Sequence, residues 1–297
     1  MQDTKKEVDK MKNTMKKPVA IPVEKLRPFA GHPFKVRDDD EMNTLIESIQ
    51  TQGILSPLIV RPIENTEEYE VVSGHRRLHA AQKAGITEVP ALIYALDRDA
   101  AAIAVVNSNL HRGHILPSER AFAYKLKADA MKHQGQRTDI TSEQIAPKLS
   151  TEVIGEQEGI SKDTVKRYIR LTHLIPELLD LMDEGKIALM VGEALSYLGD
   201  KEQYAVLEQC EVNDCTPSYA QAVEMKKRYQ DGNLTADNIS EILSREKANQ
   251  RETIKISTEK LRKYAPNADA KQLEDFILKA CEHYRKFLIR QRNRDER

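Results

Sequence analysis

Apolar positions follow two patterns in the first hundred residues. Short runs of β-branched, aliphatic and aromatic residues, bounded by polar or turn-forming residues, predict strands at 19–23, 58–60, 69–72 and 89–96. Between the first two runs, Met42, Leu45, Ile46 and Ile49 recur at helical spacing over 40–52, just before Gly53. A second helix is expected over 74–84. The pattern therefore predicts a mixed α and β region up to about residue 96.

Beyond residue 97 the apolar spacing is helical almost throughout. Breakers separate segments that predict helices at 98–110, 118–133, 142–149, 176–184, 188–198, 201–209, 217–230 and 236–244. The polar run 245–252 reads as a linker, and 271–290 predicts a last helix. One side of that helix holds Phe276, Ile277, Ala280, Tyr284, Phe287 and Leu288. Because this face is too apolar to lie in water alone, it should pack on its own domain or on a second subunit.

Residues 151–172 predict two short helices joined at Glu158-Gly159-Ile160, the outline of a helix-turn-helix. Gly155 and Gly159 suit a close approach and a left-handed turn, and Ser161 can cap the second helix. The outer face of that helix is cationic, so it is expected to bind DNA, with contacts from Ser161, Lys162, Thr164, Lys166, Arg167 and Arg170. The alternative is an ordinary solvated amphipathic helix.

The elements together predict an α+β protein. A small mixed α/β domain is followed by an all-helical domain that carries the helix-turn-helix, and then by a short helical C-terminal unit. The expected boundaries are 1–17 for a disordered basic tail, 18–115 for the mixed domain, 116–244 for the helical domain, 245–252 for the linker and 253–297 for the C-terminal unit.

Composition narrows the class of protein. Cys210, Cys215 and Cys281 are too few and wrongly spaced for a zinc finger or a disulfide framework, which favours the reducing cytoplasm. No run approaches the roughly 20 apolar residues of a membrane helix, and polar residues follow Met1, so an unexported protein is expected. The net charge is −1, but six lysines against three acids in residues 1–17 make the tail locally basic.

A second candidate site is Ser73-Gly74-His75-Arg76-Arg77, where a predicted strand ends and a helix begins. Free backbone N–H groups and the positive end of the helix dipole meet there, and two arginines add forked donors. The motif therefore indicates an anion site such as one for phosphate. Many strand-to-helix turns carry glycine and surface arginines without binding anything, so the motif alone leaves both interpretations open.

The order of motifs resembles the ParB/RepB family of DNA-partition proteins, and most closely its plasmid and conjugative-element members. The resemblance spans roughly residues 19–198. Its motifs are His32-Pro33-Phe34-Lys35-Val36-Arg37, Pro57-Leu58-Ile59-Val60-Arg61, Gly74-His75-Arg76-Arg77, Asn109-Leu110-His111-Arg112, the helix-turn-helix, and Leu174-Ile175-Pro176.

The resemblance implies that the mixed domain binds CTP with Mg²⁺. The implied nucleotide-binding residues are Gly74, His75, Arg76, Arg77, Asn109 and Arg112, and Asn109 is the implied Mg²⁺ ligand. Two positions depart from the family, which commonly has glutamate where His75 and Ser108 stand. A serine hydroxyl holds a metal or orients water less strongly than a carboxylate does, so a weak CTPase activity is left open.

Other sites are less consistent with the residues. A sulfiredoxin-like active site needs a cysteine between glycine and histidine, but Gly74 is followed directly by His75. The acidic run Asp38–Glu41 fits a solvated helix start better than a nuclease site. His111 and His114 lack further metal ligands nearby in the sequence and are expected at the surface.

The functional hypothesis is therefore a cytoplasmic, nucleoid-associated DNA-binding protein. By resemblance it would bind a centromere-like site, help segregate a plasmid, integrated element or chromosome, act as a CTP-responsive clamp, form a homodimer and engage a ParA-type ATPase. The alternative is a helix-turn-helix transcriptional regulator without nucleotide switching. Both need the same recognition helix.

Overall fold

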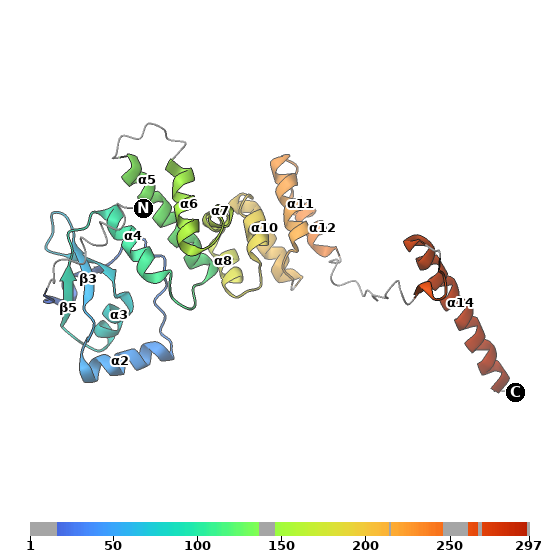
Figure 1. Ribbon diagram of the computed structural model, residues 1–297, viewed down its shortest axis with the longest axis horizontal. Coiled ribbons are helices and arrows are strands. Elements are labelled where there is room, and N and C mark those ends of the chain that lie inside the picture. The colour runs from blue at the N-terminus through green and yellow to red at the C-terminus, as the bar shows by residue number, and fades with distance from the viewer. Residues whose placement is uncertain (1–16, 137–145, 214, 246–260, 267–268, 296–297) are drawn as a thin grey trace. The chain divides into compact units, whose positions relative to one another are not determined.

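A five-stranded sheet forms the first part of the protein (Figure 1). The computed structural model describes residues 17–136, 146–213, 215–245, 261–266 and 269–295. The strands are β1 (Val19–Pro22), β2 (Leu26–Pro28), β3 (Leu58–Pro62), β4 (Tyr69–Ser73) and β5 (Glu88–Ile93), and the short 3-10 helix η1 (Val23–Lys25) joins the first two. Their order across the sheet is β1-β5-β3-β4-β2. β3 pairs parallel to β5 and antiparallel to β4, while β1 is antiparallel to β5 and β2 is parallel to β4.

Strand β2 is not among the predicted elements. It has three residues, ends at Pro28, which lacks a backbone N–H, and is held by parallel pairing that sets Leu26 opposite Tyr69. Such a strand depends on a partner far away in the sequence, so it has no local pattern of its own. β5 also stops at Ile93, before the predicted end at residue 96.

Helices cover both faces of the sheet. Successive residues of a strand point to opposite faces, and the buried Val71 and Val72 of β4 belong to two different apolar clusters. Val71 shares its cluster with Leu78 of α3 (His75–Lys83), and α2 (Asp40–Gln52) packs on α3. Val72 shares its cluster with Val105 of α4 (Arg98–Asn109). The sheet therefore places α3 on one face and α4 on the other.

The helices after α4 form the rest of this compact unit. They are α5 (Pro117–Gln136), α6 (Ala146–Glu158), α7 (Lys162–Leu171), α8 (Pro176–Asp183), α9 (Leu189–Leu195), α10 (Asp200–Val212), α11 (Tyr219–Gln230) and α12 (Ala236–Ser244). The α+β architecture predicted from the sequence is confirmed. One predicted break is wrong, because α6 continues without interruption through residues 149–151 and is itself the first helix of the helix-turn-helix. Part of the predicted helix 142–149 lies outside the described residues.

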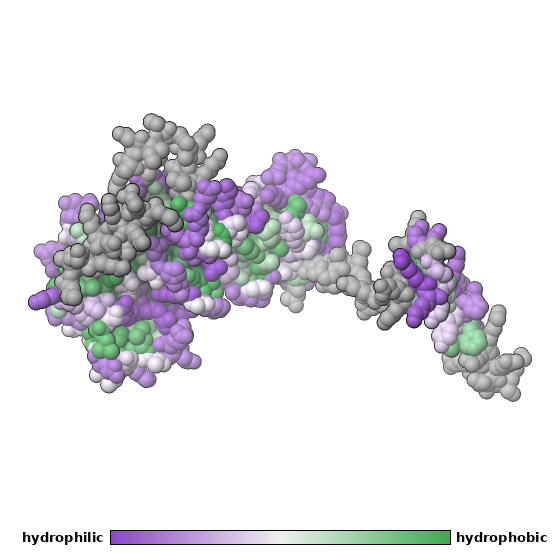
Figure 2. Space-filling view, in the orientation of Figure 1, coloured by the Kyte–Doolittle hydropathy of each residue, from purple (hydrophilic) through white to green (hydrophobic). Residues whose placement is uncertain are grey.

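The compact units divide at Arg245 and Glu246. The C-terminal unit contains α14 (Ala270–Asp295), on which Phe276, Tyr284, Phe287 and Leu288 are exposed. Figure 2 shows apolar residues of α14 at the surface among hydrophilic ones. The predicted tail and linker fall almost entirely outside the described residues, and the predicted domain boundaries stay predictions. Within the described part of the chain, no helix has the length and apolar character needed to cross a membrane.

Candidate functional site

Gly74 forms the turn from β4 into α3. It is the N-cap of α3 and has a φ of 104°, in the left-handed region that side chains disfavour. A Cβ at this position would lie 3.1 Å from Cγ of Leu58 and 3.2 Å from Nη2 of Arg77. Both the conformation and the close packing therefore require glycine. Because glycine has no side chain to cap the helix, the first turn of α3 is left with free N–H groups.

A cavity of about 610 Å³ lies beside the start of α3. Its lining comes from the segment before α2, the starts of α2 and α3, the loop between α4 and α5, and α5. The lining residues are Lys35, Arg37, Asp39, Glu41, Arg76, Arg112, Gly113, His114, Leu116 and Glu119. Four lysine or arginine side chains thus face three carboxylates. We call this cavity the cationic pocket, and its size and charge suit a phosphorylated ligand.

Arg76 and Arg112 bring two guanidinium groups to the cationic pocket. Arg76 pairs with Glu41 at 3.1 Å and with Asp39 at 3.8 Å, while Arg112 lies over the Phe34 ring, 5.8 Å from its centroid. Burial lowers the pKa of Arg112, and repulsion by Arg76 lowers it further. Two like charges that line one pocket are stabilised by an anion between them.

Arg77 lies differently from the sequence-based expectation. Its Nη1 donates to the backbone carbonyl of Pro57 at 2.9 Å and to that of Ser56, and burial lowers its pKa. Arg77 does not line the cationic pocket. In this conformation its guanidinium holds the turn before β3, so it serves the scaffold of the site.

His75 is buried next to the cationic pocket and does not line it. Its ring centroid is 3.7 Å from that of His32, and its Nε2 accepts a hydrogen bond from the backbone N–H of Phe29 at 3.3 Å. Burial lowers the pKa of His75 to about 3, and His32 and Arg112 act in the same direction. His75 is therefore neutral at physiological pH and braces the start of α3 rather than offering a positive charge to a phosphate.

Asn109 ends α4 with one amide atom unsatisfied. Its Nδ2 donates to the carbonyl of Val105 at 2.7 Å and to Oγ of Ser108 at 3.1 Å, whereas its buried Oδ1 has no hydrogen-bond partner among the described residues. A buried acceptor without a partner is costly, and an amide oxygen is a ligand that Mg²⁺ accepts. The amide oxygen is of the donor type that the resemblance implies, but Asn109 is only 3% exposed and does not line the cationic pocket. The described residues contain no cluster of three or more His, Cys, Asp or Glu able to hold a metal ion.

Five residues that line this site were not predicted from the sequence to belong to it: Lys35, Arg37, Glu41, His114 and Glu119. Lys35 and Arg37 lie in the motif 32–37, which is part of the family resemblance and was the available signal. His114 is exposed, as expected, but it lines the cationic pocket. Glu119 accepts hydrogen bonds from the backbone N–H groups of Lys35 and Leu116, at 2.9 and 3.1 Å, and so ties α5 to two sides of the pocket.

The helix-turn-helix has the local geometry that the sequence predicts. Gly159 has a φ of 67°, and a Cβ on Gly155 would lie 2.7 Å from the carbonyl oxygen of Ile160. Oγ of Ser161 accepts a hydrogen bond from the backbone N–H of Thr164 at 3.1 Å and caps α7. Val165 is fully buried against the rest of the domain. The two helices are therefore clamped at the turn, with the polar side of α7 outward.

The cationic side chains of α7 differ in how readily they can leave their present partners to contact DNA. Lys162 pairs with Glu152 at 2.8 Å, Lys166 with Asp163 at 3.4 Å and Arg167 with Glu193 at 3.3 Å. Exposed pairs of this kind are weak and can exchange for phosphate. Arg170 was expected on the exposed face of α7, and the structure corrects this expectation. Its Nη2 donates to the carbonyl of Ser196 at 2.8 Å, and its Cζ lies 4.2 Å from the centroid of the Tyr197 ring.

A buried lysine joins the two parts of the candidate site. Lys127 of α5 is only 2% exposed, and its Nζ donates to Oδ1 of Asn107 in α4 and to Oε1 of Gln157 in α6, both at 2.6 Å. Burial lowers the pKa of Lys127. The same ammonium therefore contacts the helix that ends at Asn109 and the first helix of the helix-turn-helix.

Comparisons with known proteins agree with this arrangement. Residues 4–110 match the family model described as the ParB N-terminal domain. The chain is 33% identical over 186 residues to the chromosome-partitioning protein Spo0J of Thermus thermophilus, covering 62% of each protein. It is 30% identical over 208 residues to the probable chromosome 1-partitioning protein ParB of Deinococcus radiodurans, covering 70% of this chain and 65% of that protein. Each match covers less than two thirds of the relative.

Two solved structures are also similar. The C-terminally truncated ParB of Caulobacter crescentus complexed to the centromeric parS site is 23% identical, with a TM-score of 0.39, over 76% of this chain and 98% of that chain. The same protein complexed with CTP-gamma-S is 27% identical, with a TM-score of 0.30, over 65% of this chain and 97% of that chain. Two findings together define the class of protein. One is the sheet domain, in which a helix starts with a glycine-arginine motif, and the other is the set of sequence relatives. Residues 4–110 match the ParB N-terminal domain, and the chain is similar to chromosome-partitioning proteins of the ParB and Spo0J type.

Proposed function

We propose that this protein binds a centromere-like DNA site through α7 and helps to segregate the replicon that carries the site, as a nucleoid-associated, CTP-responsive clamp. The observation that carries the proposal is the single compact unit that holds both the cationic pocket and the helix-turn-helix, connected through buried Lys127. The match of residues 4–110 to the ParB N-terminal domain supports it. A plasmid or conjugative-element origin stays a prediction.

Chromatin immunoprecipitation with sequencing tests this function. A broad zone of enrichment around one locus is expected, because a clamp leaves its loading site and occupies neighbouring DNA. Narrow peaks at several promoters would contradict the proposal and support the transcriptional regulator.

The proposed nucleotide site uses the cationic pocket. Arg76 and Arg112, helped by Lys35 and Arg37, would bind the phosphates. The proposal that Asn109 Oδ1 ligates Mg²⁺ rests on the family resemblance, because this atom is buried and Asn109 does not line the pocket. Bound CTP would supply a triphosphate that bridges these segments. The preference for cytosine rests on the family resemblance, since all nucleoside triphosphates share the groups that arginines bind. Hydrolysis should be slow or absent, because Ser108 Oγ donates to the Val105 carbonyl at 3.0 Å and offers no carboxylate.

Replacing Lys166 and Arg167 by alanine should weaken binding to the cognate DNA site. Each lost base contact costs about 1–3 kcal/mol, and each lost phosphate contact also makes the salt dependence shallower. Fluorescence anisotropy over a range of salt concentrations measures both effects. A Lys25→Ala/Arg27→Ala variant is the matched control, since it removes a paired lysine and arginine from the sheet domain. Equal affinity of the α7 variant and wild type would refute the assignment.

The exposed apolar face of α14 is proposed to form the homodimer. Phe276 is 37% exposed, Tyr284 61% and Phe287 50%, which is unfavourable for a lone helix in water. Deleting residues 258–297 should convert a dimer to a monomer in analytical ultracentrifugation. A dimer mass that survives the deletion would place the interface elsewhere. Two linked recognition helices would bind paired half-sites with higher effective concentration.

A ParA-type ATPase is the proposed protein partner, as the family resemblance implies. The segment proposed to engage it is the lysine-rich stretch 1–17, most of which lies outside the described residues. Loss of ATPase stimulation on deleting this stretch, with DNA binding retained, is the test. Equal stimulation by the truncated protein would exclude it.

A further inference from the structure

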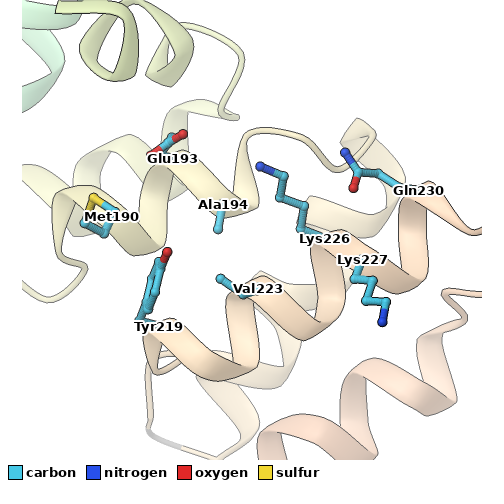
Figure 3. A pocket seen from close by; sticks show the side chains of 8 residues that line it. All are labelled: Met190, Glu193, Ala194, Tyr219, Val223, Lys226, Lys227 and Gln230. Carbon is cyan, nitrogen blue, oxygen red and sulfur yellow. The ribbon is translucent and has the colours of Figure 1, made fainter. Parts of the chain in front are cut away.

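A second cationic surface lies next to α7, outside the helix-turn-helix. A cavity of about 210 Å³ is lined by residues of α9 and α11 (Figure 3). The residues that line it are Met190, Glu193, Ala194, Tyr219, Val223, Lys226, Lys227 and Gln230. Figure 3 shows Lys226 directed toward the end of α9 and Lys227 projecting from the other side of α11. We call this region the α11 surface.

Two contacts connect the α11 surface to α7. Glu193, on the rim of the cavity, lies 3.3 Å from Nε of Arg167. At the end of α9, the Tyr197 ring is approached by both Arg170 of α7 and Lys226 of α11, at 4.2 and 3.4 Å from its centroid. The positive charges of α7 and α11 therefore meet around one tyrosine, with no intervening layer of protein.

Two lysines of the α11 surface form no ion pair with the residues that the structure describes. Arg228 on the same helix pairs with Glu224 at 2.7 Å, but neither Lys226 nor Lys227 has an ion pair among the described residues. Arg167, Arg170, Lys226 and Lys227 thus gather around Tyr197 and the cavity, and Glu193 is the one carboxylate among the residues that line the cavity. Such an excess of adjacent cations is stabilised by a polyanion.

We propose that the α11 surface binds the phosphodiester backbone of DNA immediately beside the site that α7 reads, with Lys226 and Lys227 as the phosphate contacts. This inference rests on the proposed DNA-binding function of α7. DNA is favoured over an acidic peptide because the surface is continuous with the recognition helix, so a duplex seated on α7 passes its neighbouring phosphates close to α11. In the free protein, the carboxylate of Glu193 would reduce the repulsion between Arg167 and the lysines of the α11 surface. Bound DNA would displace this pairing. Phosphate contacts of this kind extend the footprint without adding sequence information.

The experiment uses the full-length protein and a duplex recovered by selection from a random-sequence pool. The duplex is prepared in two lengths, trimmed to the selected site and extended by random flanks. Lys226→Gln/Lys227→Gln should bind the extended duplex more weakly, and the slope of log K against log salt should become shallower by about 2, since each phosphate contact contributes about 0.9. The trimmed duplex should bind both proteins equally, and the sequence preference should be unchanged.

Lys226→Arg/Lys227→Arg is the matched variant, and it should keep the wild-type slope because it keeps both charges. Equal slopes for the Gln variant and wild type on the extended duplex would overturn the proposal. An equal loss of affinity on the trimmed duplex would also overturn it. So would binding of a polyglutamate peptide that depends on these lysines, if DNA binding does not depend on them. If the wild type selects no sequence, the proposed function fails, and the slope on a random duplex still decides the role of α11.

Discussion

An Arg76→Ala/Arg112→Ala protein should bind CTP in the presence of Mg²⁺ at least about a hundredfold more weakly than the wild type. Both guanidinium groups line the cationic pocket, and a charge-assisted hydrogen bond is worth roughly 1.5–3 kcal/mol. Two such contacts sum to about 3–6 kcal/mol, and about 1.4 kcal/mol corresponds to a factor of ten. Isothermal titration calorimetry with CTP, ATP, GTP and UTP measures the loss and the base preference together.

Arg77→Ala is the informative comparison for the same experiment. The family resemblance gives Arg77 a phosphate, whereas the structure gives it the carbonyls of Ser56 and Pro57. We expect its main effect to be a lower melting temperature, with a smaller change in CTP affinity than in the double variant. Unaltered CTP binding by the Arg76→Ala/Arg112→Ala protein would remove the cationic pocket from consideration. An absence of CTP binding by the wild type at millimolar nucleotide, with cognate DNA present, would favour the plain transcriptional regulator.

The free energy of unfolding should fall as the pH is lowered from about 6.5 toward 3. His75 has its pKa lowered from 6.5 to about 3, chiefly by burial. In that interval the unfolded chain binds a proton that the folded protein does not, so acid favours unfolding. Each pH unit costs about 1.36 kcal/mol, which gives roughly 2 kcal/mol between pH 6.5 and 5 and approaches 5 kcal/mol at pH 3. Above pH 6.5 His75 is neutral in both states and contributes no slope.

Urea denaturation at a series of pH values measures this effect. His75→Gln should flatten the pH dependence, because glutamine does not titrate and its amide oxygen can still accept from the Phe29 backbone N–H. Burial also lowers the pKa of His32, which packs against His75, so His32→Gln should remove a further part of the slope. His111→Gln is the matched control at an exposed histidine and should leave the slope unchanged. An unaltered slope in His75→Gln would show that another group controls acid unfolding.

The sequence by itself determined the features that depend on near neighbours. Apolar spacing together with the acidic helix start at Asp38–Glu41 and the stop at Gly53 was sufficient for α2. In the structure Asp39 Oδ1 accepts from the Met42 N–H, and Gly53 has a φ of 70°. Gly155, Gly159 and Ser161 likewise determined the helix-turn-helix. Capping, left-handed turns and helical periodicity act over a few residues, so a single sequence carries them.

Only the tertiary structure decided which charged side chains face a ligand and which hold the fold. Arg76 and Arg77 are adjacent in sequence, yet one lines the cationic pocket and the other bonds carbonyls before β3. Lysine is usually a surface residue, yet Lys127 is buried between Asn107 and Gln157. The partners of these long side chains come from segments brought together by packing of the sheet and helices. The residues next to a long cationic side chain do not indicate whether it faces a ligand or holds the fold, because its position is set by burial and by distant acceptors.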